Sequence, residues 1–82
     1  MNQKAQVLLY TRPGCHLCEE AKREMLAAGC ADRYKLTEVN IETDPALFEL
    51  YRFDIPVILI NGQEQFRHRL TAAEFRRAVT SF

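Results

Sequence analysis

Two cysteines in this chain are separated by two residues, a spacing that suits redox chemistry or metal binding. Cys15 and Cys18 lie in the segment TRPGCHLCEE, directly after an apolar run and directly before a helical pattern. On one turn of helix, two residues at this spacing fall within the Cα separation of about 4.4 to 6.8 Å that a disulfide requires. The pair could therefore be a redox couple, half of a metal site, or two small core residues.

The expected position of the pair at a helix start favours redox chemistry. The first four backbone N–H groups of a helix lack intrahelical partners, and the aligned peptide dipoles place roughly half a positive charge there. A thiolate is stabilised at this point, and the pKa of reactive cysteines in such places falls from about 8.5 to roughly 3.5–7.5. We therefore predict that Cys15, at the helix start, is the attacking thiol. Cys18, one turn further in and more buried, is then the resolving thiol.

A metal site is the main alternative for these cysteines. Tetrahedral zinc would need a second pair of ligands, and the remaining candidates are Cys30, His16 and His68. Cys30 lies beyond the far end of the first helix, on the order of 20 Å away at 1.5 Å per residue. His16 lies inside the motif and would have to fold back. We therefore expect no metal ligands, and we interpret Cys30 as a small packing residue or an exposed spare thiol.

Length, charge and cysteine count restrict the class of protein. The 82 residues correspond to one domain, residues 1–82, and the formal net charge of zero gives no overall attraction for nucleic acid or anionic membrane. Three cysteines are an odd number, which argues against a disulfide-stapled secreted scaffold. The apolar run near the N-terminus is too short for a signal peptide, and no run approaches the roughly 20 residues of a membrane span. A cytoplasmic location, where thiols are kept reduced, is the expectation.

The first half of the chain reads as strand, helix, strand. Residues 5–10 are mostly apolar and predict a buried strand, which the Pro13-Gly14 turn ends. A helix follows until Gly29 offers a C-terminal stop. Its apolar stripe consists of Leu17, Ala21, Met25 and Ala28. Residues 34–42 alternate imperfectly and predict a second strand. Its apolar positions are Leu36, Val39 and Ile41.

The second half predicts helix, hairpin, helix. Asp44 can cap a short helix that begins at Pro45, and residues 57–60 form a β-like apolar run. Leu47, Leu50 and Tyr51 supply the apolar stripe of this helix. Asn61-Gly62 is a strong hairpin signal, so residues 63–69 should return antiparallel. The segment 71–74, TAAE, matches a capping box that opens a last helix. Its apolar face consists of Phe75, Ala78 and Val79.

The predicted order is therefore β-α-β-α-β-β-α. A strand–helix–strand start implies a right-handed crossover between parallel strands, and the hairpin adds an antiparallel pair to the same sheet. We expect a mixed four-stranded sheet flanked by three helices that cover both of its faces. This is the thioredoxin-type architecture, an α/β fold, although the element order alone also fits other small α/β folds.

The chain resembles the glutaredoxin branch of the thioredoxin superfamily over essentially its whole length, and two motifs carry the resemblance. These are YTRPGCHLC at residues 10–18 and DIPVILING at residues 54–62. The resemblance implies that Pro56 is a cis-proline that faces the disulfide and shapes a substrate groove. It implies that Ile55 offers its backbone N–H and C=O to an extended substrate. Arg12 would steady the thiolate and meet a substrate carboxylate.

The chain departs from this family pattern at two places. Glutaredoxins carry Gly-Gly and an acidic residue where they bind the γ-glutamyl end of glutathione, and this chain has Leu70 and Thr71 preceded by RHR at 67–69. The N–H and hydroxyl groups of Thr71 could still receive a carboxylate at the helix start. Between the cysteines stand His16 and Leu17, and a histidine there would add positive charge beside Cys15 and make the disulfide more oxidising. Arg67, His68 and Arg69 form either a basic site for an acidic substrate or a solvated edge.

The resemblance implies a monomeric dithiol oxidoreductase that reduces protein or small-molecule disulfides and binds no cofactor. Its electrons would come from glutathione or from a donor of the thioredoxin-reductase type. We expect neither nucleic acid nor membrane as a partner. Two alternatives remain at this point: a carrier of zinc or an iron–sulfur cluster that uses Cys15, and a non-catalytic binding module with the same fold.

Overall fold

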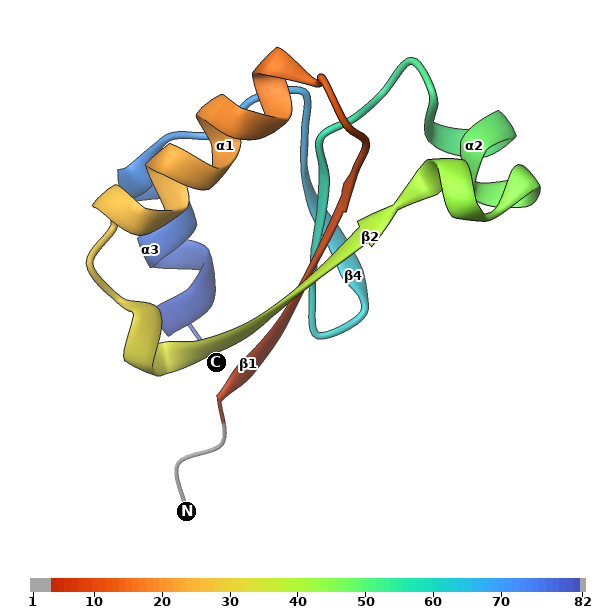
Figure 1. Ribbon diagram of the computed structural model, residues 1–82. Helices are drawn as coiled ribbons and strands as arrows, with labels where there is room; N and C mark the ends of the chain where they lie inside the picture. The colour runs from red at the N-terminus through yellow and green to blue at the C-terminus, as the bar shows by residue number, and fades with distance from the viewer. Residues whose placement is uncertain (1–3, 82) are drawn as a thin grey trace.

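The computed structural model describes residues 4–81 and contains seven main elements in the predicted order (Figure 1). These are β1 Ala5–Thr11, α1 His16–Ala27, β2 Tyr34–Asn40, α2 Pro45–Tyr51, β3 Val57–Ile60, β4 Gln63–Arg67 and α3 Ala72–Thr80. Two short 3₁₀ turns, η1 Ala31–Arg33 and η2 Ile41–Thr43, flank β2. Residues 1–3, the start of the segment that was considered as a leader, lie outside the described residues.

The sheet has the mixed topology expected from the crossover and the hairpin. Its strand order is β2-β1-β3-β4. Strands β1 and β2 are parallel, with Val7 opposite Leu36, whereas β1–β3 and β3–β4 are antiparallel. The hairpin turns at Asn61 and Gly62, whose φ angles of 50° and 84° suit a tight turn of the kind that Asn-Gly favours. The structure therefore confirms the predicted α/β fold class.

One face of the sheet is covered by α1 and α3, which lie side by side (Figure 1). Apolar residues from β1, β3 and both helices form the main core there. Its members include Val7, Leu9, Ala21, Met25, Ile58, Ile60, Phe75 and Val79. Cys30 also belongs to this core and is 2% exposed, so it is a packing residue and not an exposed thiol.

A second, smaller cluster lies at the end of β1 that leads into α1. Cys18, Ile41 and Ile55 are its buried members, and partly buried side chains from α2 pack against them. The rings of Tyr10 and Tyr51 stack with their centroids 4.7 Å apart, which ties α2 to the end of β1. Figure 1 shows α2 beside the carboxyl end of β2, away from α1 and α3. This cluster supports the cysteine pair from beneath.

Three predicted boundaries or faces are wrong, each for a local reason. Strand β2 ends at Asn40 because its side-chain oxygen accepts the Glu42 N–H at 2.9 Å, a turn that competes with the strand. Strand β4 ends at Arg67 because His68 has a φ of 71°, which breaks the extended backbone. In α2, Leu50 is 63% exposed and Phe48 contributes to the packed face in its place.

The predicted helix caps are confirmed. The Asp44 carboxylate accepts the N–H groups of Ala46 and Leu47, and Pro45 is the first residue of α2. Thr71 and Glu74 form the complete capping box of α3. Within residues 4–81, no helix has both the length and the apolar character needed to cross a bilayer.

Candidate active site

Cys15 is the N-cap residue of α1 and is joined to Cys18 by a disulfide, with their Cα atoms 5.2 Å apart. The Cys15 Sγ accepts a hydrogen bond from the Cys18 backbone N–H at 3.1 Å. This is the bond that an N-cap oxygen makes to the third residue of a helix, here made by sulfur. The helix start therefore directs one of its unpaired donors and its positive dipole end at this sulfur.

The two cysteines differ in exposure. Cys15 is half-buried, whereas Cys18 has no exposed surface and packs against Ile41 and Ile55. The expectation that Cys18 is the more buried member of the pair is confirmed. Of the two sulfurs, that of Cys15 is the one that a substrate can approach.

The Ile55–Pro56 peptide bond is cis, and Pro56 is fully buried beside the cluster that holds Cys18. The His68 N–H donates to the Pro56 carbonyl at 2.8 Å, which fixes this loop to the end of β4. The Ile55 N–H donates to the Tyr51 carbonyl at 3.2 Å. This donor is therefore paired with the end of α2, and the role of Ile55 in substrate binding stays a prediction.

Arg12 precedes the cysteines in the loop after β1, and its side chain is held by neighbours other than sulfur. Its Nε lies 3.9 Å from a carboxylate oxygen of Glu42, and its guanidinium lies 5.8 Å from the centre of the Phe48 ring. Its backbone carbonyl accepts the Cys15 N–H at 3.3 Å. Arg12 therefore supports the cysteine loop through its backbone while its half-exposed charge is shared with Glu42.

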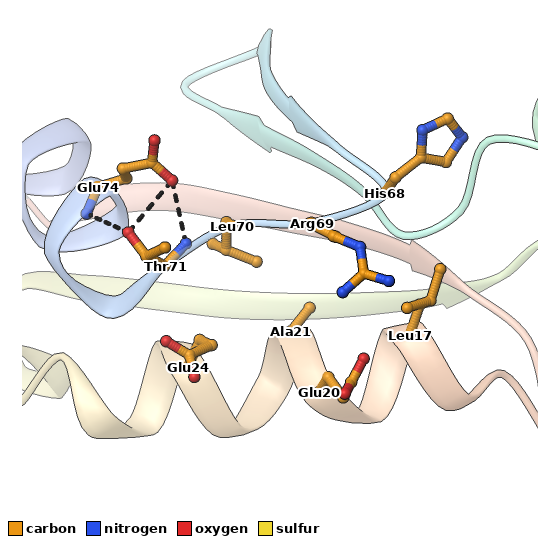
Figure 2. Close-up of a pocket in the computed structure, with 9 residues that line it drawn as sticks. All are labelled: Leu17, Glu20, Ala21, Glu24, His68, Arg69, Leu70, Thr71 and Glu74. Atoms are coloured by element: carbon orange, nitrogen blue, oxygen red, sulfur yellow. Dashed lines mark hydrogen bonds between the residues drawn. The ribbon is translucent and has the colours of Figure 1, made fainter.

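The residues between the cysteines face different surroundings. His16 is exposed at the first position of α1, and Leu17 is half-buried. Leu17 forms one end of a cavity of about 320 Å³ between α1 and the segment 68–74 (Figure 2). The other lining residues are Glu20, Ala21, Glu24, His68, Arg69, Leu70, Thr71 and Glu74. Leu70 is buried and gives this cavity part of its apolar wall.

The donors at the start of α3 are already paired within the chain. The Thr71 N–H donates to Glu74 Oε1 at 3.1 Å, and the Thr71 hydroxyl lies 3.2 Å from the same oxygen. The Ala72 N–H donates to Glu24 Oε1 at 2.9 Å. A ligand carboxylate at Thr71 would therefore have to replace Glu74, and the role of Thr71 in binding stays a prediction.

The three basic residues at 67–69 do not form one site. Arg67 pairs with Asp54 at 3.1 Å and with Glu64 at 2.7 Å, and its hydrogen bonds to Glu64 lower the pKa of that carboxyl. His68 Nε2 lies 3.1 Å from the Phe53 carbonyl. Arg69 lines the cavity. Residues 67–69 are thus divided between an ion-pair network and the cavity.

The structure separates Cys30 from the cysteine pair. Cys30 lies in the main core, whereas Cys15 and Cys18 belong to the second cluster. Among residues 4–81, no three histidine, cysteine, aspartate or glutamate side chains are grouped as a metal ion would require. Cys30 is therefore not part of the candidate site at the start of α1.

Sequence reasoning missed the role of Glu24. Its carboxylate comes from the middle of α1 and reaches Ala72, which is 48 residues further along the chain. No local pattern marks such a pairing, because Glu24 reads as an ordinary polar position on an amphipathic helix. One feature of the sequence did indicate that such a partner was needed: the helix start at Thr71 has free N–H groups that require acceptors.

A protein-family model matches most of the chain. The family described as "Glutaredoxin-like domain (DUF836)" matches residues 6–80. A curated relative, "Glutaredoxin-like protein YDR286C homolog" from Dictyostelium discoideum, is 33% identical over 70 residues. That alignment covers 78% of this chain and 65% of the relative, so the chain spans just under two thirds of that protein.

Solved structures share the fold closely. Protein XcR50 from X. campestris has a TM-score of 0.79 and 27% identity, with 93% of this chain and 97% of that chain covered. Protein Ne2328 from Nitrosomonas europaea also has a TM-score of 0.79, with 23% identity and coverage of 98% and 96%. These likenesses confirm the thioredoxin-like fold that the sequence motifs predict.

Proposed function

Because the chain belongs to the glutaredoxin-like domain family (DUF836), we propose that it is a dithiol thiol–disulfide oxidoreductase. The observation that carries this proposal is the environment of Cys15. Its sulfur caps α1 and accepts the Cys18 N–H, and Cys15 is half-buried, whereas Cys18 has no exposed surface. A helix start favours a thiolate over a thiol, and the thiolate is the nucleophile in disulfide exchange.

The first step is attack on the substrate disulfide. In the reduced protein, the Cys15 thiolate attacks one sulfur of the substrate, the substrate S–S bond breaks, and the other substrate sulfur leaves as a thiolate that takes up a proton. Cys15 and the substrate are then joined by a mixed disulfide. The exposure of Cys15 and the burial of Cys18 support this order of attack.

The second step resolves the mixed disulfide. Cys18 loses its proton and attacks the Cys15 sulfur, the Cys15–substrate bond breaks, and the second substrate thiolate leaves and is protonated. Two electrons and two protons have passed from the dithiol to the substrate. The Cα separation of 5.2 Å in the oxidised pair lies within the range that a disulfide requires.

The loop at Ile55 and Pro56 is proposed to hold the substrate chain beside the sulfurs. Pro56 has no N–H, so it places no competing donor at the site, and Ile55 contributes through its carbonyl because its N–H is bound to Tyr51. Arg12 and His16 are proposed as polar contacts for the substrate beside the cysteine pair. The substrates would be protein or small-molecule disulfides, and a monomer in the cytoplasm, with no bound cofactor, is part of this proposal.

Reduction of a protein disulfide tests the function. We expect the protein to accelerate the reduction of insulin by dithiothreitol at least about tenfold over dithiothreitol alone, because a stabilised thiolate enters the exchange. Precipitation of the insulin B chain, followed by turbidity, measures this rate. A Cys30→Ala variant is the matched control and should keep the full rate, because Cys30 lies in the main core. No acceleration by a fully reduced, folded protein would contradict the proposal.

A further inference from the structure

We propose that Glu24 sets the thiol specificity of this site: its carboxylate closes the start of α3 to thiols that carry carboxylates, and favours thiols that do not. The inference rests on the proposed function, because it concerns which thiol reduces the Cys15–Cys18 disulfide. Of the two electron donors named above, glutathione and a donor of the thioredoxin-reductase type, it disfavours glutathione.

The start of α3 binds carboxylates, and both of them belong to this chain. Glu24 Oε1 accepts the Ala72 N–H at 2.9 Å, and Glu74 Oε1 accepts the Thr71 N–H at 3.1 Å. The Glu74 N–H is in turn bound to the Thr71 hydroxyl at 3.1 Å. A carboxylate from outside would therefore find these donors already paired, and would have to displace Glu24 or Glu74 to reach them.

Glu74 is a local cap, whereas Glu24 comes from a different helix. A capping box needs only Thr71 and Glu74, and these close on each other whether or not α1 is present. The Glu24 carboxylate adds a third acceptor from across the cavity and leaves the Ala72 N–H paired as well. Removal of Glu24 therefore opens one donor without removing the cap of α3.

The cavity runs along α1 from the turn that carries the cysteine pair toward this position. Leu17, directly before Cys18, lines one end, and Glu24 and Thr71 line the other, as Figure 2 shows along α1. Glu24 lies seven positions after Leu17, which corresponds to roughly 10 Å of helix, and side chains on a helix lean back toward its N-terminus. An extended tripeptide spans at most about 10 to 11 Å. For a tripeptide thiol joined to Cys15 through its middle residue, the proposal places one terminal carboxylate in this cavity, on the side of Glu24.

The charges around the cavity also disfavour a ligand carboxylate. Three carboxylates, those of Glu20, Glu24 and Glu74, line it, against one guanidinium, that of Arg69. A further carboxylate in this partly enclosed space meets like charges that solvent screens less than on an open surface. A thiol with a neutral or cationic body does not meet this repulsion.

The reaction to be compared is reduction of the oxidised protein. A thiolate attacks the Cys15 sulfur, the Cys15–Cys18 bond breaks, and Cys18 leaves as a thiolate that takes up a proton. A second thiol molecule then displaces Cys15 from the mixed disulfide, which gives the dithiol protein and the oxidised form of the small thiol. Two thiol molecules supply the two electrons and two protons.

The test compares glutathione with glutathione diethyl ester, which keeps the thiol and the ammonium group and lacks the carboxylate charges. Second-order rate constants for reduction of the oxidised protein are measured by quenched alkylation, and each is divided by the rate constant of the same thiol with hydroxyethyl disulfide. For the wild-type protein we expect a normalised rate at least about tenfold higher for the ester than for glutathione. Equal normalised rates would overturn the proposal.

Variants assign the effect to Glu24. In Glu24→Ala we expect the normalised rate with glutathione to rise at least about fivefold, while the rate with the ester changes less than about twofold. Glu20→Ala is the matched control, because it removes a carboxylate from the same wall that has no hydrogen bond to α3. An equal gain in Glu20→Ala would overturn the assignment. Glu24→Gln keeps the shape of the side chain, so it supplies the test if Glu24→Ala does not fold, and it should also favour glutathione.

These measurements are independent of catalysis. Exchange at the Cys15–Cys18 disulfide can be followed whether or not the protein accelerates the reduction of insulin. A protein that discriminates between the two thiols and does not turn over insulin would support the role of Glu24 and contradict the proposed function. A protein that turns over insulin and reacts equally with both thiols would support the proposed function and contradict the role of Glu24.

Discussion

Replacing Cys15 by serine is expected to abolish the acceleration of disulfide reduction, so that the observed rate falls to within about twofold of that with dithiothreitol alone. A serine hydroxyl at the same position can still accept the Cys18 N–H, so α1 keeps its cap. It cannot form the sulfur nucleophile on which the exchange depends. The measurement is insulin reduction by dithiothreitol, with thermal unfolding to show that the variant is folded.

Replacing Cys18 by serine should have a different effect. Cys15 keeps its position and can still attack, but the mixed disulfide is no longer resolved from within and accumulates. Intact-protein mass spectrometry after addition of hydroxyethyl disulfide should show one mercaptoethanol adduct, and peptide mapping should place it on Cys15. An adduct on Cys30, or wild-type turnover in Cys15→Ser, would contradict the assignment of the nucleophile.

Replacing Phe75 by alanine is expected to cost about 3–5 kcal/mol of unfolding free energy. The Phe75 ring has no exposed surface, meets Tyr34 edge-on at 5.1 Å and packs α3 onto the sheet. Since small domains have total stabilities of about 5–15 kcal/mol, this loss would remove a large share of the total. Urea unfolding followed by circular dichroism measures the change.

Phe53 provides the matched control for this prediction. It is the same residue type and is 80% exposed in the loop after α2. Phe53→Ala should change the unfolding free energy by less than about 0.5 kcal/mol, because surface positions contribute little to the core. Equal losses in the two variants would show that the core is not organised around α3 as described.

The fold could be predicted from the sequence because its boundaries are set by local chemistry. Asp44 and Thr71 cap the helices that follow them, and Asn61 with Gly62 turns the hairpin, each through groups within a few residues. The end of β2 was missed for a related reason. The turn at Asn40 depends on one side-chain hydrogen bond, which an imperfect alternation of apolar residues does not reveal.

The cysteine pair could likewise be predicted, whereas its surroundings could not. The position of Cys15 as N-cap follows from a turn before it and a helical pattern after it. Whether an individual N–H group is free or hydrogen-bonded depends on partners that the spacing of residues in the sequence does not specify. The Ile55 N–H returns to the end of α2, and the Ala72 N–H reaches Glu24 on a helix 48 residues earlier.

The most direct test of the central claim is to map the thiols of the reduced wild-type protein before and after it meets one equivalent of hydroxyethyl disulfide. Alkylation followed by peptide mass spectrometry reports each cysteine separately. We expect that Cys15 and Cys18 lose their thiols together and form one disulfide, that two molecules of mercaptoethanol are released, and that Cys30 stays reduced. A Cys15–Cys18 pair that stays reduced while the substrate disulfide persists would contradict the account.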